Sequence, residues 1–191
     1  MHSTILAIAR AWIGTPYHHQ ASVKGVGCDC IGLVRGIWRE LYGPEPEPLP
    51  AYTRDWAEAH GREPLLDAAR CHLVEVSVSE TQPGDVLVFR WRRNAPAKHC
   101  AILSKPPLPA CGERVGVRGS RERDPIVCGT MIHALEGAPV SEVSLSPWWH
   151  RHLAGVFMFP AASPSRPIGL TPLSAVRRPA PGTLAAERSR G

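Results

Sequence analysis

Two cysteines flank an aspartate in the stretch GVGCDCIGLVRGIW, at residues 25–38 of this 191-residue chain. Cys30 lies where an amphipathic run begins. The first N–H groups of a helix lack intrahelical partners and the helix dipole is positive there, so a thiolate at this position is stabilised. When a cationic group also lies beside the thiol, the pKa of a cysteine at a helix N-terminus falls from about 8.5 to roughly 3.5–7.5. This position therefore indicates a possible nucleophile at Cys30.

Other interpretations of the two thiols remain open. Cys28 and Cys30 could bind a metal together with His99 and His133, although common zinc sites space their paired cysteines two to four residues apart. The chain has no second cysteine pair with that spacing. Both thiols could also be small core hydrophobes, which is the common role of cysteine and the one we expect for Cys28.

A nucleophilic cysteine needs a base, usually a histidine that a third polar group holds in place. His99 begins the expected strand KHCAIL, and His133 lies within the expected strand MIHAL. On adjacent antiparallel strands their Cβ atoms would be about 4.5–5.5 Å apart if the residues were directly opposite, which would let one imidazole orient the other. Either histidine alone would more simply be structural, but together they point to a Cys30–His99–His133 site.

The elements that must position these residues follow from the apolar periodicity. Helical spacing comes first along the chain, and strand-like alternation begins near Cys71. Helices are expected at 3–13, with Ser3 or Thr4 as its cap, at 29–42, and at 54–70 with a break at Pro64. Strands are expected at 71–79, 85–91, 98–104, 130–137, 140–145 and 153–160, with a hairpin around Gly137. This order predicts an α+β domain with helices packed on one face of an antiparallel sheet.

Two segments do not fit a compact domain. Residues 105–129 interrupt two expected strands with prolines, glycines and arginines, which indicates a loop insertion. Residues 161–191 are rich in Pro, Ser, Ala and Arg, which is typical of a disordered tail. The domain should therefore span residues 1–160. The six cysteines are too few and too irregular for a secreted disulfide scaffold, so free thiols are expected, with a Cys111–Cys128 disulfide as the alternative.

Charge and hydropathy exclude two classes of partner. The net charge is +5, but the segment 161–191 holds five arginines and one glutamate and so supplies +4 of it. The rest of the chain has no basic stripe with interleaved aromatics, so nucleic acid is not an expected partner. No segment reaches the roughly 18 apolar residues of a membrane span, and the first residues do not resemble a signal peptide.

Five ordered motifs carry a family resemblance: WIGTPY, GCDCIGLV, PGDVLVF, KHCAI and MIHA. With them the chain resembles the NlpC (or p-sixty) cysteine peptidases over about residues 5–160, without the insertion. The stretches HQAS, RGIWRELYG, DWAE, AKH and WW resemble the phage cell-wall peptidase type. The resemblance implies a papain-like α+β fold. It also implies hydrolysis of peptidoglycan stem peptides, typically between γ-D-glutamate and a diamino acid.

The same resemblance implies roles for individual residues. Cys30 matches the nucleophile, His99 the general base and His133 the polar residue that orients the base. Tyr17 matches a tyrosine near the substrate cleft, although it could equally be a packed aromatic. Asp29 matches an acid that assists substrate binding, with a helix N-cap as the alternative. The implied reaction needs no metal and no organic cofactor.

The chain departs from the wider family in three ways. Ile31 follows Cys30 where many members have serine, so any substrate contact made by that hydroxyl is absent. The stretch HHQAS replaces a usual glycine pair, which would alter the shape of the cleft. His99 and His133 are 34 positions apart because of the insertion, which could misplace His133 and reduce activity.

The resemblance also suggests a setting, because related proteins occur in phages and in gene-transfer agents. The expected partners are the peptidoglycan stem peptide and the tail or hub proteins of a phage-like particle. Such a protein would be made in the cytoplasm without a signal peptide and delivered by the particle to the periplasmic cell wall. The alternatives are a structural tail-tip component with weak or no activity, and a different peptidoglycan amidase or acyl transferase.

Overall fold

The computed structural model describes residues 1–48, 52, 63–106 and 129–161 of the chain. Most of the expected insertion, the expected tail beyond Ala161, and both Cys111 and Cys128 lie outside the described residues. The predictions made for those segments therefore stay predictions.

In the part of the chain that the structure describes, six antiparallel strands form the main sheet, in the order β3-β8-β4-β5-β6-β7. They are β3 (Val74–Val76), β4 (Val86–Arg90), β5 (Ala97–Lys105), β6 (Gly129–His133), β7 (Ser141–Leu145) and β8 (Leu153–Met158). A separate two-stranded ribbon, β1 (Ser22–Val23) with β2 (Gly27–Cys28), precedes the second helix.

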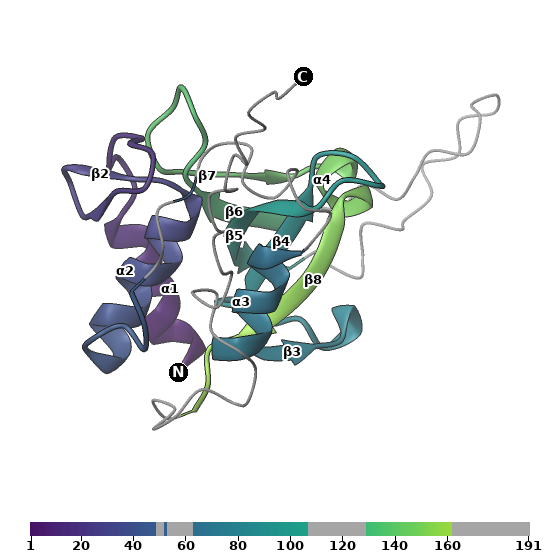
Figure 1. Ribbon diagram of the computed structural model, residues 1–191, viewed down its shortest axis with the longest axis horizontal. Coiled ribbons are helices and arrows are strands. Elements are labelled where there is room, and N and C mark those ends of the chain that lie inside the picture. The colour runs from purple at the N-terminus through teal and green to yellow at the C-terminus, as the bar shows by residue number, and fades with distance from the viewer. Residues whose placement is uncertain (49–51, 53–62, 107–128, 162–191) are drawn as a thin grey trace, which may run out of the picture.

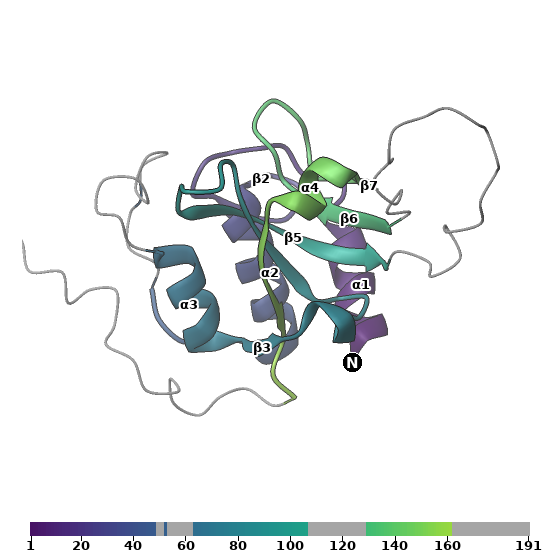
Figure 2. The same ribbon diagram turned by 90° about the vertical axis from the view of Figure 1, so that its right-hand side faces the viewer.

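Among the described residues, three helices pack on one face of this sheet (Figure 1). They are α1 (His2–Ala11), α2 (Cys30–Tyr42) and α3 (Pro64–His72), and α2 lies between the other two in the rotated view (Figure 2). A fourth, short helix, α4 (Pro147–Arg151), lies between β7 and β8. The α+β class and the packing of helices on an antiparallel sheet are confirmed.

Each face of the sheet has its own core. Side chains of α1, α2 and α3 meet one face, where Leu33 and Ile37 of α2 are fully buried. The other face carries a smaller cluster that includes Phe89, Met131 and the half-buried Trp149 of α4. Because β5 contributes to both clusters, its residues 99–104 are buried without alternation. This central strand carries His99 between the two cores.

Two local predictions were wrong and a third was right. The break expected at Pro64 is present, because Glu63 is not helical and α3 begins at Pro64, whose fixed φ fits the first helical position. The expected helical residues 54–62 lie outside the described residues. The strand expected at 71–79 is limited to β3, because its first residues belong to α3 and Val78–Glu80 forms a 3-10 turn. The first helix is preceded by Met1 and not capped by Ser3 or Thr4.

Candidate active site

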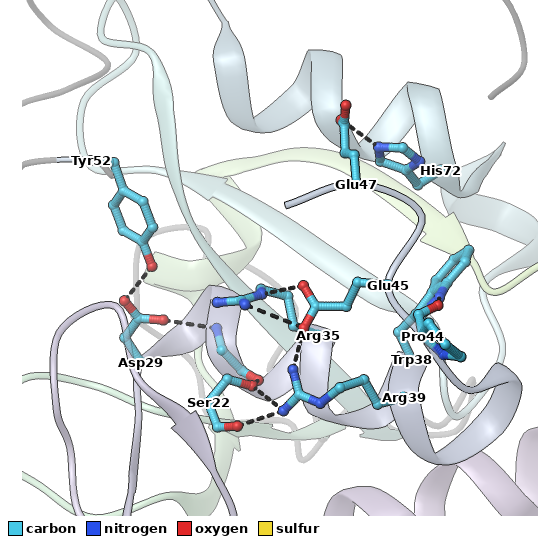
Figure 3. Close-up of polar contacts among 11 residues, drawn as sticks. Ser22, Asp29, Arg35, Trp38, Arg39, Pro44, Glu45, Glu47, Tyr52 and His72 are labelled. Carbon is cyan, nitrogen blue, oxygen red and sulfur yellow. Dashed lines mark hydrogen bonds and ion pairs between the residues drawn. The ribbon is translucent and has the colours of Figure 1, made fainter. Parts of the chain in front are cut away.

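Asp29 fixes the start of α2. Its Oδ1 atom accepts a hydrogen bond from the Gly32 N–H at 2.7 Å, which confirms the N-cap interpretation. Its Oδ2 atom accepts from the Tyr52 hydroxyl at 2.5 Å (Figure 3). The same atom accepts from the Gln20 N–H at 2.7 Å. The buried carboxylate therefore ties the preceding loop and Tyr52 to the first turn of the helix, where Cys30 lies.

Polar contacts also hold the connector after α2 against the ribbon before it (Figure 3). The Arg39 guanidinium donates to the Ser22 backbone oxygen at 2.5 Å and also to Glu45. Arg35 donates to the same Glu45 carboxylate at 2.7 Å. Through these contacts α2 holds the connector that follows it, at Glu45, and the ribbon that precedes it, at Ser22. The loop that leads to Cys30 is thereby fixed against the helix.

The two cysteines of the opening motif have different surroundings. Cys28 is fully buried in the helix-side core, and burial raises the pKa of its thiol to about 12. Cys30 is half-buried. A hydrogen bond from the Cys100 thiol, followed by the charge of His99 and a hydrogen bond with it, holds the pKa of Cys30 well below its ordinary value against the opposing effect of burial. The core interpretation of Cys28 is confirmed, and Cys30 has the electrostatic setting of a reactive thiol.

His99 and His133 meet through their rings. The Nε2 atom of His99 lies 3.1 Å from the Nδ1 atom of His133, and both residues are buried. They are not directly opposite: the Ile102–Ile132 pair of the β5–β6 register places His133 opposite Ala101. The contact is therefore diagonal, which long side chains can span.

The protonation of this pair follows from its burial. Burial, followed by the charge of His99, lowers the pKa of His133 to about 4, so its ring is neutral near pH 7. A neutral ring can accept a hydrogen bond at Nδ1 from the Nε2–H of His99. That contact leaves Nδ1 as the nitrogen of His99 available to Cys30, with which His99 forms a hydrogen bond.

Aromatic rings enclose His99. The ring centroids of Trp149, Trp91 and Phe89 lie 5.3, 5.6 and 6.2 Å from that of His99. Trp149 also contacts His133 edge-on at 5.6 Å. These rings exclude water from the histidine pair and fix its orientation. The pair WW was visible in the sequence only as part of a resemblance, since the short helix that carries it was not predicted.

The residues around Asp29 include Tyr52, which sequence reasoning missed. The Tyr52 backbone oxygen accepts from the Gln20 side-chain amide at 2.5 Å and lies 3.0 Å from the Nε2 atom of His19. Tyr52 follows the proline-rich connector, where no periodicity marks it. Tyr17 forms an isolated parallel bridge with Cys28 and packs, half-buried, against the helix-side core. This placement agrees with the packed-aromatic alternative, while its substrate role stays a prediction.

Two observations concern ions and membranes. Within the described ranges, no three His, Cys, Asp or Glu side chains are grouped so that they could hold a metal ion. Among the helices of that same part of the chain, none is both long and apolar enough to cross a bilayer.

The four cysteines described, at positions 28, 30, 71 and 100, are free thiols.

Comparison with known proteins places this geometry in context. The family model described as NlpC/P60 family matches residues 14–158, which include Cys30, His99 and His133. Curated proteins gave no match.

Solved structures of the same family have a similar fold. An NlpC/P60 family protein from Bacillus cereus is 18% identical, with a TM-score of 0.50, over 83% of this chain and 40% of that one. The NlpC/p60 domain of the peptidoglycan hydrolase SagA is 22% identical, with a TM-score of 0.48, over 83% and 99%. A protein from Staphylococcus aureus, described as similar to a lipoprotein of the NLP/P60 family, is 20% identical, with a TM-score of 0.45, over 83% and 41%. The chain thus spans about two fifths of the Bacillus and Staphylococcus proteins.

Proposed function

The chain belongs to the NlpC/P60 family, whose members are generally cysteine peptidases of peptidoglycan, and on this premise we propose that it hydrolyses peptidoglycan stem peptides. The observation that carries the proposal is the Cys30–His99–His133 arrangement. A half-buried thiol with a lowered pKa lies at a helix start, beside an imidazole that a second, neutral imidazole holds in place. These are the parts that nucleophilic catalysis by a cysteine needs.

In the proposed mechanism, the Cys30 thiolate forms an ion pair with His99 and attacks the carbonyl carbon of the stem peptide. Protonated His99 then gives its proton to the leaving amine, and water releases the acyl-enzyme with His99 as the base. His133 accepts the Nε2–H of His99 and so keeps Nδ1 directed at the sulfur. Asp29 acts through the helix cap, and Tyr17 is proposed to lie at the substrate cleft.

The start of α2 supplies candidate donors for the oxyanion. The Gly32 N–H is bound to Asp29 Oδ1, and the Leu33 N–H is bound to the Asp29 backbone oxygen. The remaining N–H groups of that turn belong to Cys30 and Ile31, and we assign them to the developing negative charge. Loss of one such donor costs about 2.7–4 kcal/mol of transition-state stabilisation in a serine protease.

The peptide bond that is cleaved and the biological setting of the protein are proposed from the sequence motifs. The target is the γ-D-glutamyl–diamino acid bond, and the protein acts as a cell-wall peptidase of a phage or gene-transfer agent, with tail or hub proteins as partners. Phage-type stretches such as HQAS, RGIWRELYG and WW support this assignment. A protein made in the cytoplasm would then reach the periplasmic wall as part of a particle.

The first prediction tests the nucleophile. The Cys30→Ala variant should release no stem fragments from purified peptidoglycan, because it lacks the attacking sulfur. Cys71→Ser, at a half-buried thiol on α3, is the matched control and should digest like wild type. Mass spectrometry of the fragments should show a new D-glutamate terminus.

Three results would contradict the proposal. If the Cys30→Ala variant digests peptidoglycan as fast as wild type, Cys30 is not the nucleophile. Cleavage at the muramoyl–alanine bond would favour an amidase. Absence of digestion by wild type, together with no selectively acid-shifted alkylation of Cys30, would favour a structural tail component.

A further inference from the structure

A second thiol lies against the proposed nucleophile. The Sγ atom of Cys100, the residue after His99, is 3.2 Å from the backbone oxygen of Cys30. The thiol of Cys100 donates to that oxygen, and its interaction with the Cys30 side chain is the largest of the effects that lower the pKa of Cys30. Cys100 is part of the helix-side core, but packing there requires only a small apolar side chain and not a thiol placed against Cys30.

The two cysteines differ in access and in reactivity. Cys30 is half-buried and tends to be a thiolate, whereas Cys100 is only 2% exposed and its pKa is raised well above the ordinary value. An oxidant that reaches the site therefore meets Cys30 first. A low-pKa, accessible cysteine poised beside a second cysteine is the arrangement found in reversible redox sites.

We propose that Cys30 and Cys100 form a reversible disulfide modification site, in which hydroperoxides oxidise Cys30 and Cys100 resolves the product. The proposal rests on the proposed function only in that Cys30 is the nucleophile to be protected. Formation of the disulfide would switch off hydrolysis, and thiol reductants would restore it.

The chemistry balances in two steps. The Cys30 thiolate attacks one oxygen of the hydroperoxide and the O–O bond breaks. With one proton this gives the Cys30 sulfenic acid and water from hydrogen peroxide, or an alcohol from an organic hydroperoxide. The Cys100 thiol then attacks the sulfenic sulfur, an S–S bond forms, and the thiol proton leaves with the hydroxyl as water. Peroxide is reduced by two electrons and the two thiols are oxidised by two. A dithiol reverses the product by exchange.

Oxidation of Cys30 itself prepares Cys100 to react. The raised pKa of Cys100 comes first from its hydrogen bond to Cys30, then from burial, then from the charges of Cys30 and Asp29. A sulfenic acid at Cys30 is neutral, so the charge of Cys30 disappears and the hydrogen bond to a thiolate is lost. The Cys100 thiol then ionises more readily, and its fixed proximity gives a high effective concentration.

The test maps the bond directly. The full chain, in a Cys111→Ser background, is treated with hydrogen peroxide, alkylated and digested with trypsin. Cleavage after Lys24, Arg35, Lys98 and Arg114 gives peptides 25–35 and 99–114. We expect these two peptides to be cross-linked, with the loss of two hydrogen masses. Fragment ions on either side of Asp29 then distinguish Cys30 from Cys28.

The Cys100→Val variant tests whether Cys100 protects Cys30 from irreversible oxidation. After peroxide and then dithiothreitol, wild type should regain alkylation of Cys30. Cys100→Val should recover about tenfold less, because its sulfenic acid proceeds to sulfinic and sulfonic acids that dithiols do not reduce. Cys71→Ser should recover like wild type. These readouts need no hydrolysis, so they can fail or succeed independently of the proposed function.

Two results would overturn the proposal. One is a wild-type protein in which Cys30 carries added oxygen while Cys100 still alkylates after denaturation. The other is a disulfide from Cys30 to Cys28 or to any cysteine other than Cys100. If Cys100→Val fails to fold, the peptide map of the wild-type background alone decides between these outcomes.

Discussion

His133 contributes a neutral, buried ring to the site. Its Nδ1 atom accepts from His99, and a proton on that atom would remove the acceptor and place a second positive charge beside His99. Burial, which disfavours the charged ring, and then the charge of His99 lower the pKa of His133 to about 4. The same residue that orients His99 therefore makes the folded protein sensitive to acid.

The second prediction concerns this sensitivity. The pKa of His133 is about 4 when folded and about 6.5 when unfolded, so between these values the unfolded chain binds a proton that the folded protein does not. Stability from this group is complete above pH 6.5 and falls by about 3 kcal/mol as the pH drops towards 4. Urea unfolding at pH 7 and pH 4 measures the loss.

A non-titrating variant is the control. In His133→Gln the amide oxygen can still accept from His99 but binds no proton in this range, so its loss of unfolding free energy between pH 7 and pH 4 should be smaller. His150→Gln, at an exposed residue of α4, should behave like wild type. An equal loss in wild type and His133→Gln would contradict the assignment.

Helix α2 depends on close approach to α1. A Cβ atom at Gly36 would lie 2.0 Å from the Cζ2 atom of Trp12. The Trp12 ring is buried, and its Nε1–H donates to Glu40 Oε1 at 2.9 Å, so it cannot move aside freely. Glycine at this position lets the two helices meet, and this packing sets where the first turn of α2 presents Cys30.

The third prediction follows from this contact. Gly36→Ala should lower the free energy of unfolding by about 1–3 kcal/mol through overpacking, although alanine is the better helix former. Chemical denaturation measures the change. In a Trp12→Leu background the same substitution should cost less, because the ring is gone. Equal costs in the two backgrounds would show that Trp12 is not the obstacle.

At the scale of the whole molecule, β5 and β6 bring His99 and His133 together across a long sequence separation. Lys105 and Thr130 are partners in the antiparallel register, so the two strand ends adjoin wherever residues 107–128 run. The pairing of these strands, with their buried neighbours, is enough to place the two histidines. The expected insertion therefore need not disturb the site.

The fourth prediction replaces residues 107–128 with a short glycine-containing turn. The free energy of unfolding should stay equal or rise by up to about 1 kcal/mol, because a shorter loop closes at a lower entropic cost. Alkylation of Cys30 should keep its rate and pH dependence. A selective loss of Cys30 reactivity in a stably folded variant would show that this segment helps to form the site.

Local chemistry in the sequence was sufficient for several features. The periodicity of residues 29–42, which Gly43 follows, predicted α2, because helical burial depends on near neighbours. The N-cap was one of two roles that the sequence left open for Asp29. Short apolar runs bounded by turn residues, with the turn at Gly137, predicted β4 to β8 in the same way. The motifs then named Cys30, His99 and His133 as the residues to watch.

Tertiary packing alone decided the rest. The diagonal contact of His99 with His133, the enclosure by Trp149 and the placement of Cys100 against Cys30 all join segments far apart in the chain. Such contacts depend on strand register and on the angle at which α2 crosses β5, and neither is encoded in local spacing. The sequence by itself could therefore name a nucleophile and its base, whereas only the folded chain brought a second thiol to the same sulfur.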